Sequence, residues 1–528
     1  MTAIWSGLRT GFAGAAALML TTVLPAHAEK TITAVMHSGL RVLDPVITTA
    51  HITRDNAFMI YDTLVALNSD FEVTPQMASF AVSDDGLSYT FTLRDGLKWH
   101  DGGDVTPADC IASIKRWMQR DGGGQMIADR MASLEATGDK TFVLTLKEPF
   151  PYTLEAMAKT SSLALFMMPE RIASQPADEA ITEYIGSGPF RFVTEEFQPG
   201  VKVVYEKFED YVPADGPPSW FSGAKDVKVD RVEWVTMPDA QTSINALMNA
   251  EIDFMEFVPV DLLPLLEGMP GIQTEVLAPL GSVTIGRMNF LYPPFDNKKI
   301  RQAALMAISQ NDVLTALQGN PDYFKVCGAI FGCGTPFEFA DGSDTLTSGG
   351  DIEGAKALLA EAGYDGTPVV LMQPTDVVTI APQPVVAAQA LREAGFNVDL
   401  QPMDWQTLVG RRASQSAPDD GGWNMFFTNW IVPEVSNPLA NVMLNGRGDD
   451  AWFGWPDDPE IEALRTDFAN AVGLDAQKAV AEKIQAHVMD NVNYIHLGQL
   501  YSPSAWSDTL TGVEQAPFPV FWGIDKTE

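Results

Sequence analysis

Cysteine and histidine are scarce in this chain. Among 528 residues there are three cysteines and six histidines, which excludes a small fold held together mainly by disulfides. No two histidines stand in an H-E-x-x-H motif or in another paired metal-ligand spacing. From these absences the sequence predicts neither a metal site nor a cofactor.

Positive charge is also scarce. The chain has 34 Lys and Arg residues against 69 Asp and Glu residues, for a formal net charge of −35 at pH 7. Nucleic acids and anionic lipids need a basic face, so we expect no nucleic-acid partner. Net charge says little about a single binding cleft. We interpret the acidic excess as a source of solubility and not as a field for cationic ligands.

The motifs of common enzyme classes are missing too. The chain has no G-x-S-x-G, no P-loop and no Rossmann glycine run. Ser187 lies in a glycine-rich turn, without the strand–elbow–helix frame of a hydrolase serine. Active sites can also assemble from residues far apart in the sequence. A secreted hydrolase acting on a small polar substrate is therefore the alternative to a binding protein.

A long apolar run occurs only at the start of the chain. Arg9 precedes an apolar segment at 11–24, and Ala26-His27-Ala28 follows as a cleavage motif. The segment is shorter than the ~20 residues that a membrane-spanning helix needs. We expect a signal peptide at 1–28, cleaved after Ala28, and a mature protein in the periplasm.

Two of the three cysteines lie close together. Cys327 and Cys333 are separated by five residues in a glycine-rich loop. In an oxidising compartment this spacing predicts a disulfide, whereas a zinc site would need two more ligands nearby. Cys110 follows Pro107 in an expected helix, and we interpret it as a small buried apolar side chain.

Local patterns predict both strands and helices. At roughly 150 residues per domain, 528 residues correspond to about three units. Apolar and polar residues alternate over 89–93, which predicts a strand, and Asp95-Gly96 predicts a hairpin turn after it. Thr106 followed by Pro107 is typical of a helix start.

Strands and helices alternate after about residue 278. The expected strands are 283–289, 369–372, 397–401 and 423–428. The expected helices between and around them are 298–309, 351–362, 384–394 and 405–413. Helices that connect strands predict parallel pairing with right-handed crossovers.

One stretch carries a family resemblance. Residues 83–117, SDDGLSYTFTLRDGLKWHDGGDVTPADCIASIKRW, closely resemble the family 5 extracellular solute-binding proteins. These are the peptide- and nickel-type receptors of bacterial ABC importers. Further segments are similar to the same family: GSGPF at 186–190, NALMNAEIDF at 245–254, and PPFD at 293–296 with its following helix.

The resemblance implies a fold and a division of the chain. The fold is α/β, a two-lobed periplasmic-binding-protein fold of type II (large cluster), with an extra subdomain in the first lobe. The first lobe would take 29–277 and 496–528, and the extra subdomain about 75–184. The second lobe would take 278–495.

The resemblance also implies a function. The protein would be a monomer and not an enzyme, and would capture a small solute by closure of the lobes. It would then deliver the solute to the permease subunits of an ABC transporter. The solute would be peptide-like or another organic compound, with an opine, an oligosaccharide and a metal chelate as alternatives.

The segment 423–447 is the main candidate for contact with the solute. In peptide-binding relatives an Asp shortly after a G-W pair binds the α-amino group of the peptide. Here Trp430 is kept, Pro433 stands near the expected Asp, and Glu434 follows. Glu434 is either a substitute or a solvated loop acid, and Trp430 either stacks on the ligand or belongs to the core. We add Asn429, and we expect unmodified dipeptides and tripeptides to be poor ligands.

Five more residues complete the candidate site, two of them in the loop 37–49 that follows a first strand expected at 31–36. Arg411 and Arg412 follow Trp405 where relatives often carry an Arg, and a guanidinium suits a carboxylate or phosphate. Cations at the end of a helix are the alternative explanation. Trp405 belongs to the core or to the rim of the cleft. His37 and Asp44 are candidates in the loop after the first expected strand.

Overall fold

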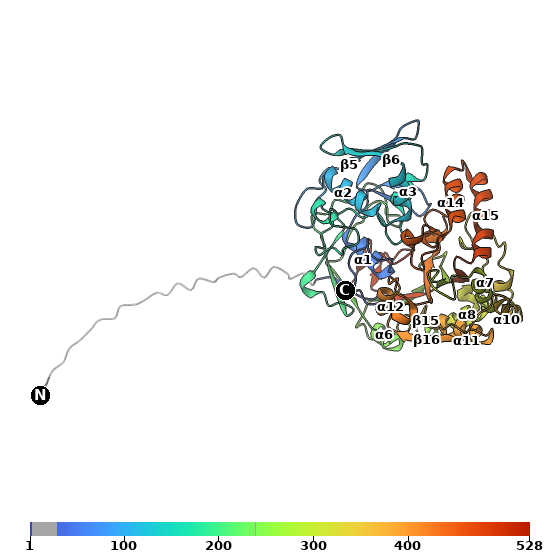
Figure 1. Cartoon of the computed structure of the whole chain (residues 1–528). Coiled ribbons are helices and arrows are strands. Elements are labelled where there is room, and N and C mark those ends of the chain that lie inside the picture. Colours follow the sequence, from blue (N-terminus) through green and yellow to red (C-terminus); the bar gives the residue numbers. More distant parts are fainter. Residues whose placement is uncertain (3–28, 238, 528) are drawn as a thin grey trace.

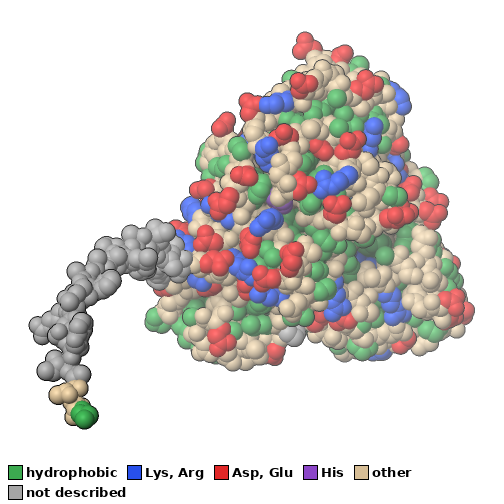
Figure 2. Space-filling view, turned by 90° about the vertical axis from the view of Figure 1, so that its left-hand side faces the viewer, with side chains coloured by type: hydrophobic (Ala, Val, Ile, Leu, Met, Phe, Trp, Pro, Cys, Tyr) green, Lys and Arg blue, Asp and Glu red, His purple; other side chains and the backbone are tan. Residues whose placement is uncertain are grey.

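The computed structural model describes residues 1–2, 29–237 and 239–527 (Figure 1). The expected leader falls almost entirely on residues 3–28, which lie outside the described residues. Among the described helices, none combines the length and the apolar character needed to cross a lipid bilayer. On the face shown in Figure 2, acidic and basic side chains are interspersed.

The first sheet has seven strands in the order β12-β19-β11-β1-β10-β9-β8. β1 runs parallel to both of its neighbours, β10 and β11, while the remaining pairs are antiparallel. The bounds, in sheet order, are Ile272–Glu275, Ser504–Ser507, Phe254–Met255, Thr31–Val35, Arg231–Val235, Lys202–Lys207 and Phe190–Phe192. The chain therefore builds this sheet from its beginning, its middle and its end.

Helix α1 (His51–Ile60) packs against the first sheet, and only His51 is not fully buried. The helix ends at Ile60, and Val65–Leu67 forms the short strand β2. Gly188 donates a backbone hydrogen bond of 3.0 Å to the Ile60 carbonyl. A Cβ at Gly186 would overlap that carbonyl oxygen, so the predicted glycine-rich turn serves the close approach of two backbones.

A separate antiparallel sheet has the order β4-β5-β7-β6, in which β6 is Met131–Ala136 (Figure 1). The expected strand and helix are confirmed as β5 (Ser88–Leu93) and α2 (Pro107–Trp117), with Thr106 and Asp109 forming a capping box. The predicted hairpin is wrong. β5 pairs with β4 (Ala78–Val82), which precedes it, and with β7 (Thr141–Leu146). The turn is at 83–86, where Gly86 has a φ of 69°.

The second sheet has six strands in the order β14-β18-β13-β17-β15-β16. Their bounds, in sheet order, are Phe324–Lys325, Ile495–Leu500, Ser282–Met288, Met425–Ile431, Val369–Pro374 and Val398–Met403. Parallel pairing is confirmed for β15 with β16 and β17, but β13 is antiparallel to β17 and β18. β13 carries the chain away from the first lobe and β18 brings it back, so these neighbours run in opposite directions.

Helices flank the second sheet (Figure 1). The expected helices are found with shifted ends as α7 (Lys298–Ala307), α10 (Ile352–Glu361), α11 (Gln383–Glu393) and α12 (Trp405–Arg411). α8 (Gln310–Gln318), α14 (Pro459–Asn470) and α15 (Leu474–Asn491) complete this part of the molecule.

The disulfide between Cys327 and Cys333 is present, and Cys110 is buried, as expected. The disulfide loop packs on the second sheet, because the Cys333 N–H donates to Gln499 at 3.0 Å. β18 belongs to the second sheet, and the chain reaches the first sheet again only at β19. We therefore propose to place the end of the second lobe after Leu500 and not at residue 495.

Candidate ligand-binding site

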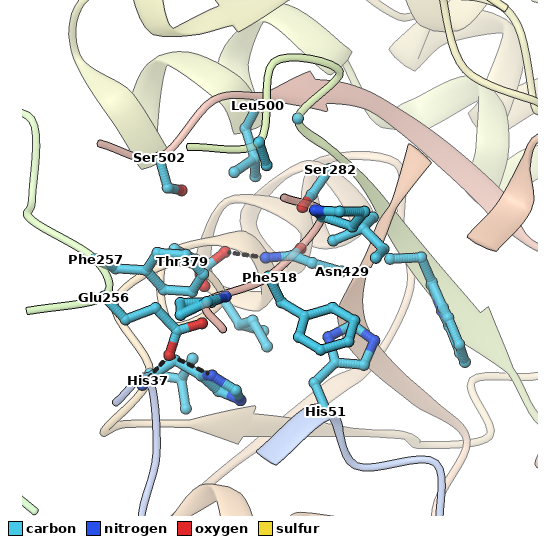
Figure 3. Close-up of a pocket in the computed structure, with 18 of the residues that line it drawn as sticks. His37, His51, Glu256, Phe257, Ser282, Thr379, Asn429, Leu500, Ser502 and Phe518 are labelled. Carbon is cyan, nitrogen blue, oxygen red and sulfur yellow. Dashed lines mark hydrogen bonds and ion pairs between the residues drawn. The ribbon is translucent and has the colours of Figure 1, made fainter. Parts of the chain in front are cut away.

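A cavity lies where the ends of the two sheets face each other (Figure 3). From the first lobe it is lined by residues that follow β1 and β11, by α1 and by the segment 516–519. From the second lobe it is lined by the ends of β17 and β18 and by residues after β15 and β16. Ligands of open α/β sheets bind outside the carboxyl ends of strands, and this cavity occupies that position.

The cavity is part of a longer hollow region. Its free volume is about 80 Å³, and two further hollows of about 290 and 450 Å³ also lie between the lobes. Thr49 lines both the first and the second hollow. Glu434 lines the third, while its carboxylate contacts two residues that line the first. The interface between the lobes therefore has room beyond the first cavity.

The N-terminal turn of α1 carries charged side chains into this interface. Arg54 bonds to Asp55 and forms an ion pair with Glu434 of α13 (Val432–Val435). His51 Nε2 lies 3.3 Å from Glu434 Oε2. Only 2 % of Glu434 is exposed, so it is a buried ionic partner of the first lobe and not a solvated loop acid.

A second polar group adjoins the first on the same side of the cavity. His37 Nδ1 lies 2.8 Å from Glu256 Oε2, and the backbone N–H of His37 donates to the same oxygen at 2.7 Å (Figure 3). Asp55 Oδ2 lies 3.9 Å from His37 Nδ1. This oxygen is buried without a hydrogen-bond partner among the described residues.

The pKa values in this cluster follow from burial and from neighbouring charges. Burial raises the pKa of Asp55 to about 6, although Arg54 opposes the shift. Burial would lower the pKa of His37, but the charges of Glu256 and Asp55 outweigh it and raise that pKa. For His51 the effect of burial is larger than that of the Glu434 charge, so the pKa of His51 is lowered. The raised pKa of Asp55 therefore reflects mainly the desolvation of its buried carboxylate.

Arg412 is a buried guanidinium with no carboxylate partner among the described residues. Its exposed fraction is 1 %, and it donates one hydrogen bond, of 3.2 Å, to Thr49 Oγ1 of the first lobe. Burial lowers its pKa to about 9. The rings of Trp405, Phe426, Trp452 and Phe453 surround it, at 5.2–5.9 Å from its Cζ. Its Nε has no acceptor among the described residues.

Trp430 and Asn429 both line the cavity. The Trp430 ring meets His51 at 5.5 Å and Trp452 at 5.4 Å, edge to face, and 2 % of the residue is exposed. The buried indole N–H has no acceptor in the described part of the chain. Asn429 donates to Thr379 (Figure 3) and accepts from Gln383, so its amide is held in place at the cavity wall.

The structure gathers most of the predicted candidates in one region. His37, Trp405, Asn429 and Trp430 line the cavity, and Glu434 and Arg412 lie directly behind it.

Two candidates lie elsewhere. Arg411 bonds to the carbonyls of Gly421 and Gly422 and to Gln401, and lines none of the three hollows. Asp44 is buried against Arg116 at 2.9 Å, so it joins a loop to α2. The side chains of Arg411 and Asp44 both make contacts that stabilise the fold.

Several cavity residues had no sequence signal. Thr49, His51, Arg54 and Glu256 were not expected at the site. The segment 51–56, HITRDN, is rich in polar residues, which are usually exposed to solvent. Nothing in the local sequence shows that α1 is buried on all sides.

Comparisons with known proteins agree with this architecture. Residues 72–451 match the model of the bacterial extracellular solute-binding proteins, family 5. The chain is 41% identical, over 98% of both proteins, to a probable peptide ABC transporter periplasmic-binding protein of Sinorhizobium fredii. The chain belongs to this family. It is also 27% identical to a glutathione-binding protein of Pectobacterium atrosepticum, over 96% of each chain.

Solved structures share the fold of this family 5 protein. The oligopeptide-binding protein of Bacillus subtilis, in complex with a nonapeptide, matches with a TM-score of 0.79 at 19% identity, over 95% of this chain and 100% of that one. A periplasmic binding protein of A. tumefaciens R10, in complex with agropinic acid, matches with a TM-score of 0.78 at 20% identity, over 94% and 99%. Both likenesses show the two-lobed fold.

Membership of the family fixes the class of the protein. It is a solute-binding protein that acts outside the cytoplasm. The family and the relatives' names indicate binding and not catalysis, and they give the alternative of a secreted hydrolase no support.

Proposed function

We propose that this protein captures an organic solute with an anionic group and delivers it to the permease of an ABC importer. Two buried donors carry the proposal: Arg412 Nε and Trp430 Nε1 have no acceptor among the described residues. Buried donors normally have partners. Both side chains contact Trp452, so the donors belong to one region between the lobes. A carboxylate there would satisfy two donors that the protein leaves open.

Lobe closure would regulate access to Arg412. Thr49, its one hydrogen-bond partner in the described part of the chain, belongs to the first lobe, and Arg412 belongs to the second. Hinge opening separates such partners. In an open state the guanidinium would therefore face the cleft, where it can meet a ligand carboxylate. Peptide-like compounds and other small organic acids fit this chemistry, in line with the peptide- and glutathione-binding relatives.

The contacts of Glu434 affect which peptides can bind. Its carboxylate is already bound by Arg54 and His51, so a peptide α-amino group would have to compete with a buried ion pair. Breaking such a pair typically costs 3–5 kcal/mol. We therefore expect unmodified dipeptides and tripeptides to bind poorly. Calorimetric titration with a mixed panel tests this. Sub-micromolar binding that N-acetylation abolishes would assign the amine to Glu434 and contradict the expectation.

The remaining parts of the proposal concern export and assembly. We propose that residues 1–28 are a signal peptide cleaved after Ala28, that the mature protein is a monomer, and that it neither turns over its ligand nor binds nucleic acid. The acidic composition, with a net charge of −35, supports the last point.

Mass spectrometry of the protein purified from its native periplasm tests the central proposal. We expect an intact organic acid to be released on unfolding, and the same compound to raise the melting temperature of stripped protein. Recovery of cleaved products that accumulate with time would indicate an enzyme. A ligand without any anionic group would contradict the role of Arg412.

A further inference from the structure

Three side chains beside the cavity come together from distant parts of the chain. His37 follows β1, Asp55 lies on α1, and Glu256 follows β11. One ligand atom of each, an imidazole nitrogen or a carboxylate oxygen, lies within 4.8 Å of the other two. Sequence spacing does not reveal this group, because its members are separated by 18 and about 200 positions.

The hydrogen bonds of the fold leave these atoms only partly used. Asp55 Oδ1 accepts from Arg54 Nε at 2.8 Å and from Nη2 at 2.7 Å. Asp55 Oδ2, on a residue that is 2 % exposed, faces His37 and has no hydrogen-bond partner in the described part of the chain. An unpartnered buried carboxylate oxygen is costly, and here it lies beside two further potential ligands.

The charges of the region also favour a cation. Three carboxylates, on Asp55, Glu256 and Glu434, are buried together. The permanent positive charge among their partners is Arg54, which is shared between Asp55 and Glu434. Among the described residues, the ionic contact of Glu256 is with His37. The cluster is thus short of positive charge, and a bound cation would supply it.

We propose that His37, Asp55 and Glu256 form a binding site for a divalent transition-metal ion such as Zn²⁺. One imidazole and two carboxylates suit zinc and its neighbours better than Ca²⁺ or Mg²⁺, which prefer oxygen alone. Zinc bonds of roughly 2.0–2.2 Å need ligand atoms about 3.4 Å apart. The distances of 2.8 Å and 3.9 Å from His37 Nδ1 bracket that value.

The surroundings supply the other features of a metal site. Arg54 fixes the Asp55 carboxylate through its second oxygen, and the His37 backbone fixes Glu256. Such contacts behind the ligands tune metal affinity. His37 and Glu256 line the cavity (Figure 3), which gives an entry path and leaves open coordination positions toward it. This inference goes beyond the proposed function and does not depend on the identity of the solute.

Titration of the untagged protein with Zn²⁺, after removal of metals by a chelator, tests the site. We expect one ion per chain with a dissociation constant on the order of a micromolar or tighter. His37→Ala and Glu256→Gln should each weaken binding at least about tenfold, as loss of ligands or their close partners does. His487→Ala is the matched control, since His487 contacts two carboxylates, Asp458 and Glu460, in the other lobe. It should leave the affinity unchanged.

Anomalous scattering at the zinc edge, on crystals of the unsubstituted protein, gives a test that does not rely on the folding of variants. A peak between His37, Asp55 and Glu256 would support the site. A peak elsewhere, no peak, or Zn²⁺ affinity that His37→Ala leaves unchanged would overturn it. Binding of an organic solute in the presence of chelator is measured separately, so failure of the metal site and failure of the proposed function are distinguishable.

Discussion

At the scale of single residues, Arg412 is the buried charge on which the proposed function depends. A buried guanidinium with no carboxylate partner is destabilising, because no ionic attraction offsets the free-energy cost of its desolvation. Here aromatic rings cover it, and Thr49 accepts its hydrogen bond. The neighbouring Arg411 is partly exposed and bonded to a loop of its own lobe. The two adjacent arginines therefore differ in their surroundings, and the proposed function assigns ligand binding to Arg412 and not to Arg411.

Replacing each of the two arginines with methionine tests this difference. Arg412→Met should weaken binding of the native solute by about 2–5 kcal/mol, the cost of losing one partner of a buried charge pair. It should leave the free energy of unfolding unchanged or raise it. Arg411→Met should leave affinity unchanged. Calorimetric titration and urea unfolding of both variants measure these effects. Equal losses of affinity in the two variants would contradict the assignment.

Asp458 and His487 form an ion pair whose effect on stability depends on pH. They lie 2.8 Å apart. Burial alone would raise the pKa of Asp458, but hydrogen bonds from His487 and Asn493 hold it at about 2. The same bond raises the pKa of His487. Stabilisation through His487 is complete below its unfolded pKa of about 6.5, and is lost as pH rises through the folded value. Stabilisation through Asp458 is complete above about 3.9 and is lost as pH falls toward about 2.

His487→Ala should therefore reduce the free energy of unfolding most between about pH 4 and pH 6.5, where both charges are present in the folded and unfolded states. The difference from the unsubstituted protein should shrink at higher pH. Urea unfolding at a series of pH values measures it. A difference that does not vary with pH would show that the imidazole acts only by packing.

At the scale of elements, local patterns were predictable, but strand pairing was predictable only in part. β5 and α2 follow from alternation and from a capping box, which act over a few residues. The partner of β5 depends on β4 and β7, and no local pattern chooses between the turns before and after a strand. The direction of β13 likewise follows from the path of the chain between lobes. Periodicity does not carry that information.

The site was predictable only where the family resemblance reached it. Trp430 and Glu434 were found because they lie near a recognisable segment, although the ionic partners of Glu434 were not. Those partners, His51 and Arg54, lie on a helix whose polar residues are buried. A sequence pattern marks polar residues as exposed by default. Here tertiary contacts bury the polar residues of α1.

The disulfide loop supports the element that carries Glu434. Gly332, between the two cysteines, packs against Val432 at the start of α13. Cys327→Ser with Cys333→Ser should lower the free energy of unfolding by about 2 kcal/mol, the chain-entropy value for so short a loop. Urea unfolding of the double variant measures the loss, with Cys110→Ser as the control for thiol chemistry. Free thiols at both positions in native periplasmic protein would contradict the pairing.

At the scale of the whole molecule, buried polar contacts hold the two lobes together. Arg54 pairs with Glu434, and Thr49 accepts hydrogen bonds from Arg412 and Trp452 at 3.2 and 3.1 Å. The contact of Arg41 with Asp404 lies at the surface and contributes little. The lobes can therefore approach each other without a solute, and the solute adds contacts that favour the closed state.

Glu434→Gln should shift the equilibrium toward the open form. The substitution removes the charge that joins α1 to α13 and leaves Arg54 with Asp55, so closure loses an ionic contact that exists only between lobes. Small-angle scattering of the ligand-free variant should give a larger radius of gyration. Asp458→Asn, whose partners lie within the second lobe, should leave the radius unchanged.

The central claim is that a solute is held by closure of the lobes and is not transformed. Small-angle scattering of the stripped protein, with and without the native solute and followed by mass analysis of that solute, tests this most directly. The account predicts a smaller radius of gyration in the presence of solute and recovery of the solute unchanged. An unchanged radius together with consumption of the solute would contradict it.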